Sequence, residues 1–96
     1  MELLVIACSS TLQEQVLAFF ARAGIASYTQ VPEVVGAGQG GGTRLNSEIW
    51  PGVNTLFLVA LAPGQATAVR EWARAYRARP VREGLKVFSL ALQEMV

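Results

Sequence analysis

The sequence contains one pattern twice: an apolar run, a short turn and then an amphipathic segment. The first copy is LLVIACSSTLQEQVLAFF, residues 3–20, and the second is LFLVALAPGQATAVREWA, residues 56–73. A short aliphatic run is typical of a strand that is buried on both faces, and the apolar residues behind it recur at helical spacing. We therefore expect two strand–helix units in this chain.

The first helix is predicted by an apolar stripe formed by Leu12, Val16, Phe19 and Phe20. Ser10 with Gln13, or Thr11 with Glu14, has the spacing of a capping box, and Gly24 stands where a left-handed C-terminal residue is expected. The second helix begins near Pro63 and ends before Pro80. Its buried face is predicted to contain Val69, Trp72, Ala73 and Tyr76.

Four strands are expected, at about Glu2–Cys8, Ser27–Val35, Asn54–Leu61 and Leu85–Leu92. The order β-α-β-β-α-β is that of an α+β, ferredoxin-like sandwich, in which two helices cover one face of a four-stranded antiparallel sheet. Pro32 cannot donate to a ladder, so the second strand is predicted to be an edge strand or to be bulged there.

The other face of the sheet should be covered too, because the strands are apolar on both sides. A chain of 96 residues forms one domain, 1–96, with a thin core, yet 52% of its residues are apolar and 16% are charged. We expect the apolar surface that this core cannot bury to be buried between copies of the chain. The alternative is a monomer with an apolar surface.

The stretch Val34–Gly52 holds six of the nine glycines. Successive glycine N–H groups can cradle an anion and let a loop become ordered on binding; the alternative is a flexible hairpin connection without a ligand. Lys86, the only lysine, opens the last strand beside Gly84 and either faces a phosphate or is solvated. The candidate ligand-binding residues are Gly36, Gly38, Gly40, Gly41, Gly42, Thr43, Arg44, Gly84 and Lys86. Trp50, in the same loop, could stack on a base, anchor a contact between subunits or pack on the sheet edge.

This layout, the loop VVGAGQGGGT and the last strand EGLKVFSL resemble PII-like signalling proteins, relatives of the nitrogen-regulatory PII proteins. Gly36, Gly38 and Gly42 match the glycines at the base of the PII T-loop, here about residues 36–52, and Lys86 to Phe88 match the Lys-Ile-Phe of its last strand. The resemblance implies a homotrimer that binds an adenine nucleotide (ATP, ADP or AMP) in clefts between subunits. It also implies that the loop regulates a partner, such as a membrane transporter. Gly40 stands where PII proteins have an effector-binding Gln, so a ligand set other than ATP with 2-oxoglutarate is expected.

Several other functions are not expected. The chain has no His or Asp for acid–base work, and its single Cys8 has no imidazole to activate it, so neither an enzyme nor a soft-metal site is predicted. The net charge of +1 favours neither nucleic acid nor a membrane, although Arg70, Arg74 and Arg77 form a stripe that is either solvated or attracts anions. No apolar run is long enough to insert into a membrane, so a cytoplasmic protein is expected. Two alternatives are a ligand-free interaction module of the same fold and a metal-handling protein like the divalent-cation tolerance proteins.

Overall fold

The computed structural model describes residues 1–36, 53–80 and 83–96. Its elements follow the predicted order. They are β1 (Glu2–Ser9), the 3-10 turn η1 (Ser10–Leu12), α1 (Gln13–Ala23), β2 (Thr29–Val34), β3 (Asn54–Leu61), α3 (Pro63–Arg77) and β4 (Leu85–Ala91). The predicted α+β class and element order are therefore confirmed.

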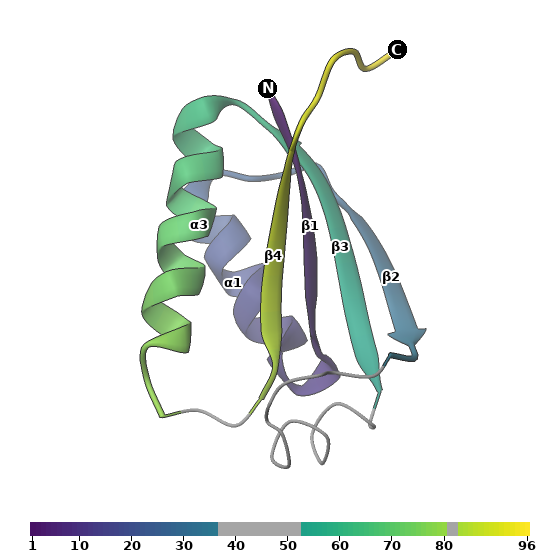
Figure 1. Cartoon of the computed structure of the whole chain (residues 1–96), viewed down its shortest axis with the longest axis vertical. Coiled ribbons are helices and arrows are strands. Elements are labelled where there is room, and N and C mark those ends of the chain that lie inside the picture. Colours follow the sequence, from purple (N-terminus) through teal and green to yellow (C-terminus); the bar gives the residue numbers. More distant parts are fainter. Residues whose placement is uncertain (37–52, 81–82) are drawn as a thin grey trace.

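The four strands form one antiparallel sheet in the order β2-β3-β1-β4, so β2 and β4 are its two edges. Figure 1 shows α1 and α3 side by side on one face of this sheet. This is the ferredoxin-like sandwich that the sequence predicts. Both chain ends lie at the same end of the sheet, where Leu92 N–H donates to the Met1 carbonyl over 3.2 Å.

The core lies between the sheet and the helices, because alternate residues of each strand point toward the helical layer. Leu4 and Ile6 of β1 are fully buried, and they pair with Val59 and Phe57 of β3. From the helices, the buried side chains are those of Leu12, Val16, Phe20, Ala66, Val69, Ala73 and Tyr76. The predicted helical faces are thus confirmed, with Phe19 and Trp72 half-buried and stacked at a centroid separation of 4.9 Å.

The second strand confirms both parts of the Pro32 prediction. It is an edge strand, and its register with β3 shifts between Val31 and Val34. Glu33 sits inside this bulge at φ 59°, in the left-handed region that non-glycine residues rarely occupy. The strand is also shorter than expected, since it begins at Thr29 instead of Ser27 and ends at Val34.

The predicted capping boxes of the first helix are wrong. Ser9 is the cap, with extended backbone, and its hydroxyl accepts from Thr11 N–H over 3.3 Å, whereas α1 itself begins after Leu12 without a side-chain cap. The chain leaves β1 through a 3-10 turn, so the first N–H groups that lack an acceptor within the helix belong to this turn, directly after the strand. Gly24 ends α1 in the left-handed conformation, φ 75°, as predicted.

Candidate functional site

Four chain segments meet at one end of the sheet. β1 and β2 end there and β3 and β4 begin there, because neighbouring strands are antiparallel. The meeting is fixed by backbone bonds: Ser9 N–H donates to the Gly84 carbonyl over 3.1 Å, and Ser10 N–H donates to the Val53 carbonyl over 2.9 Å. The turn after β1 therefore ties the start of β4 to the residue that precedes β3. We call this region the loop end of the sheet.

Three of the predicted ligand-binding residues lie in the described part of the chain, and all three are at the loop end. Gly36 follows β2, Gly84 precedes β4, and Lys86 pairs with Ala7 one residue inside β4. Gly36 and Lys86 are exposed. The other six candidates lie outside the described residues, as does Trp50; they are Gly38, Gly40, Gly41, Gly42, Thr43 and Arg44.

Gly36 and Lys86 belong to opposite edges of the sheet. Gly36 follows the edge strand β2 and Lys86 lies in the edge strand β4, and β3 and β1 lie between these two strands. With neighbouring strands about 4.8 Å apart, the two edges are roughly 14 Å from each other. A Cβ added at Gly36 would meet no atom of the described residues within 4 Å, so packing inside the described chain does not require glycine there.

A hydroxyl network lies on the helix side of the loop end, and sequence reasoning missed it. The Thr55 hydroxyl donates to Gln13 Oε1 over 2.9 Å, so the Ser10 hydroxyl, 3.1 Å from Thr55 Oγ1, is the donor of that second bond. Thr55 is fully buried. The signal available in the sequence was a threonine inside an otherwise aliphatic strand, and the network anchors β3 to α1 beneath the site.

The sheet face opposite the helices is an apolar surface, which we call the open face. Its rows run across the strands: Leu58, Val5 and Phe88 form one row, and Ala60, Leu3 and Leu90 form the next. Phe88 is 51% exposed and Leu90 is 49% exposed. A hollow of about 380 Å³ on this face is bounded by Leu3, Leu58 and Met95. Lys86 belongs to the same face, at its loop end.

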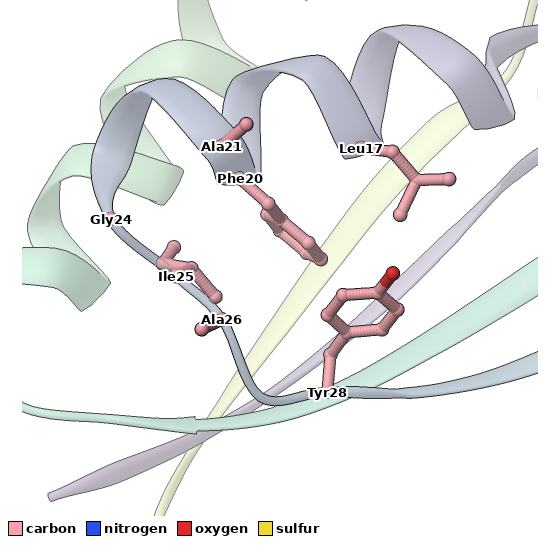
Figure 2. A pocket seen from close by; sticks show the side chains of 7 residues that line it. All are labelled: Leu17, Phe20, Ala21, Gly24, Ile25, Ala26 and Tyr28. Atoms are coloured by element: carbon pink, nitrogen blue, oxygen red, sulfur yellow. The ribbon is translucent and has the colours of Figure 1, made fainter.

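A second hollow, of about 390 Å³, lies at the opposite end of the fold. Figure 2 shows it between the last turns of α1 and the start of β2, with Leu17, Phe20, Ile25 and Tyr28 among its lining side chains. These side chains carry no charge, and Gly36, Gly84 and Lys86, the predicted ligand-binding residues that the structure describes, do not line the hollow. The loop end is therefore the better candidate for an anion site.

One arginine of the predicted stripe has a structural role. Arg70 forms an ion pair with Glu2 of β1, and the Ser89 hydroxyl donates to the same carboxylate oxygen over 2.6 Å. The Ser89 bond, with the Arg70 guanidinium beside it, lowers the pKa of Glu2 below its ordinary value of 4.5. This contact joins α3 to β1 and β4, while Arg74 and Arg77 remain exposed.

Cys8 is a core residue, as predicted. It is fully buried, and burial raises the pKa of its thiol to about 11, so the thiol is protonated at neutral pH. Residues 1–36, 53–80 and 83–96 contain no group of three metal-ligating side chains. In these same ranges, no helix has the length and apolar character needed to cross a membrane.

The chain matches no protein-family model and no curated protein sequence. It is similar in structure to apo CPII from Thiomonas intermedia K12, a nitrogen regulatory PII-like protein. That match has a TM-score of 0.67 and 16% identity, and it covers 93% of this chain and 87% of CPII. CPII bound to ADP, AMP and bicarbonate matches with a TM-score of 0.68 and 16% identity over 99% of this chain and 94% of CPII.

A protein from Thermus thermophilus described as a PII-like signalling protein is also similar. It matches with a TM-score of 0.63 and 22% identity over 92% of this chain and 82% of that chain. Each of the three matches covers more than nine tenths of this chain and more than four fifths of the other chain. The chain therefore has the fold of the PII-like proteins.

Proposed function

We propose that this chain is a PII-like signalling protein that binds a small anionic effector, an adenine nucleotide, in clefts between the subunits of a homotrimer. Effector binding then changes the conformation of the glycine-rich loop, and the loop regulates a partner protein, such as a membrane transporter, from the cytoplasm. The main support for the proposal is the fold match to CPII bound to ADP, AMP and bicarbonate, which extends over 99% of this chain.

The trimer is supported by the open face. Its two apolar rows across β3, β1 and β4 are continuous, and Phe88 and Leu90 leave about half of their surface uncovered in a single copy. Contiguous apolar surface of this kind marks an interface. Three copies whose open faces point inward would bury these rows around one axis, which is a closed cyclic arrangement.

The position of the effector site between copies is supported by the sheet order. In one copy the loop base and Lys86 lie at opposite edges, but a cyclic trimer brings the β2 edge of one copy toward the β4 edge of the next. The loop side of a cleft would then contain Gly36, Gly38, Gly40, Gly41, Gly42, Thr43 and Arg44. The facing side would contain Gly84 and Lys86 of the neighbouring copy, with Lys86 supplying positive charge for a phosphate.

A nucleotide screen tests the proposal. ATP, ADP and AMP are added one at a time, with and without bicarbonate, and the thermal unfolding midpoint is measured. A nucleotide at 100 times its Kd stabilises the folded protein by about 2.7 kcal/mol, a clear upward shift for a chain of this size. Absence of any shift with all three nucleotides would contradict the proposal.

Mixed trimers test where the site lies. Arg44→Ala and Lys86→Ala alter the two proposed sides of the cleft, so each homotrimer should bind ADP weakly. After the two variants are unfolded and refolded together, some clefts combine an intact Arg44 from one copy with an intact Lys86 from the next. Recovery of wild-type affinity in a fraction of the sites supports a shared cleft, whereas uniformly weak binding in the mixture would place both residues in one copy's own site.

A further inference from the structure

A hydrogen bond joins the end of α3 to the residue immediately before Gly84. Tyr76, in the last turn of α3, is 4% exposed, and its hydroxyl lies 3.2 Å from Glu83 Oε1. The ring is held in place by its neighbours: it stacks on Trp72 at a centroid separation of 6.2 Å, and the guanidinium carbon of Arg79 lies 5.3 Å from its centre. The hydroxyl therefore reaches Glu83 from a fixed position.

The bond has a defined donor and acceptor. Burial, reinforced by the charge of Glu83, raises the pKa of Tyr76 to about 12, so the phenol stays protonated at neutral pH and its O–H donates a hydrogen bond to the carboxylate. A hydrogen bond to an ionised acceptor is stronger than one between neutral groups. Glu83 is consequently held on the helix side of the sheet.

The residues after Glu83 are fixed by other elements. The Gly84 carbonyl accepts from Ser9 N–H over 3.1 Å, and Leu85 is buried and pairs with Cys8. Three successive residues are thus attached to α3, to the end of β1 and to the core. Lys86 follows, and its side chain lies on the open face, away from Tyr76.

Glu83 would oppose anion binding if it were free to turn. It is the carboxylate nearest in sequence to Gly84, and it stands three residues before Lys86. A second negative charge within several ångströms of a bound phosphate lowers affinity, and an unattached glutamate can adopt rotamers that bring it closer. Attachment to Tyr76 keeps this charge on the face opposite Lys86.

We propose that Tyr76 and Glu83 are positioning residues of the effector site: their hydrogen bond fixes the start of β4 and holds the Glu83 carboxylate away from an anion bound at Gly84 and Lys86. This inference rests on the proposed function, because it concerns the same anion site. Neither side chain is expected to touch the effector. Both act indirectly: their hydrogen bond fixes the backbone of residues 83–86 and keeps the negative charge of Glu83 away from the anion.

The test is calorimetric titration of ADP into wild type, Tyr76→Phe, Glu83→Gln and the double variant. Tyr76→Phe keeps the ring and should weaken binding by about fivefold or more, since it frees a charged group that was hydrogen-bonded. Glu83→Gln keeps an acceptor for Tyr76 but removes the charge, so it should bind ADP at least as tightly as wild type. The double variant should recover most of the affinity lost in Tyr76→Phe, which a purely structural role of the bond would not produce.

Tyr28→Phe is the matched control, because it removes a tyrosine hydroxyl at the far end of the sheet. Hydrogen exchange of the Ser9 amide gives a readout that needs no ligand: it should be faster in Tyr76→Phe than in wild type and unchanged in Tyr28→Phe.

Wild-type affinity and unchanged Ser9 exchange in Tyr76→Phe would overturn this inference alone. An equal loss of affinity in Tyr76→Phe and in the double variant would overturn the charge argument. If wild type binds no nucleotide, the proposed function fails and the anion-placing role fails with it, while the exchange measurement still decides whether the bond fixes the start of β4.

Discussion

Replacing Phe88 with Ser should dissociate the proposed trimer. Phe88 is 51% exposed in a single copy and lies at the β4 end of an open-face row with Val5 and Leu58. Half of a phenylalanine side chain is about 100 Å². At about 25 cal/mol per Å², burial between copies contributes roughly 2.5 kcal/mol per copy, or about 7.5 kcal/mol for three copies. The substitution should therefore raise the trimer dissociation constant by about five orders of magnitude.

Sedimentation equilibrium at several protein concentrations measures this effect. Wild type is expected to remain three times the 10.3 kDa chain mass at micromolar concentration, and Phe88→Ser should approach the single-chain mass. Val35→Ser is the control, because Val35 is 92% exposed but follows the end of β2 and is outside the sheet. Identical masses for wild type and Phe88→Ser over the whole range would refute the assignment of the open face as the interface.

Three further predictions concern single side chains. Lys86→Ala should weaken ADP binding by about tenfold in calorimetry through loss of a charged contact to phosphate, whereas Arg77→Ala, which removes an exposed charge of α3, should not; equal effects would contradict a specific role for Lys86. Thr55→Val should lower the free energy of unfolding by about 1–3 kcal/mol in urea, because it removes two hydrogen bonds, to the half-buried side chains of Ser10 and Gln13. No loss of stability would mean that the network adds none. Glu2→Gln should reduce the acid sensitivity of the thermal unfolding midpoint. The pKa of Glu2 is lower in the folded state than in the unfolded state, so the ionised Glu2 carboxylate stabilises the fold above pH 4.5, and this stabilisation is lost as the pH falls further. Parallel pH profiles for the variant and the wild type would argue against this linkage.

Local patterns in the sequence predict the layers of this fold well. The strand Asn54–Leu61 has the predicted bounds, because a short aliphatic run favours a strand through local residue preferences alone. Pro32 correctly marks an edge strand with a bulge, because a proline has no N–H to donate to a neighbouring strand in any sheet. Gly24 correctly marks the end of α1 for a similarly local reason.

Features that depend on distant partners were not predictable in this way. Ser9 is the helix cap because the chain enters a 3-10 turn, a choice set by the bonds of Ser9 and Ser10 to the carbonyls of Gly84 and Val53. The pairing of Thr55 with Gln13 spans 42 residues and follows only from the packing of β3 against α1. For the candidate site, the structure places Gly36, Gly84 and Lys86 at one end of the sheet, and their separation onto opposite edges follows from strand order, which local sequence patterns do not give. Their role in ligand binding stays a prediction.

A native mass spectrum of the wild-type protein with added ADP tests the central claim most directly, because it counts subunits and bound nucleotides in the same particle. The account predicts a particle of three chains that takes up as many as three ADP molecules, with no ADP on any single chain. Single 10.3 kDa chains at micromolar concentration, or trimers that remain without nucleotide, would contradict it.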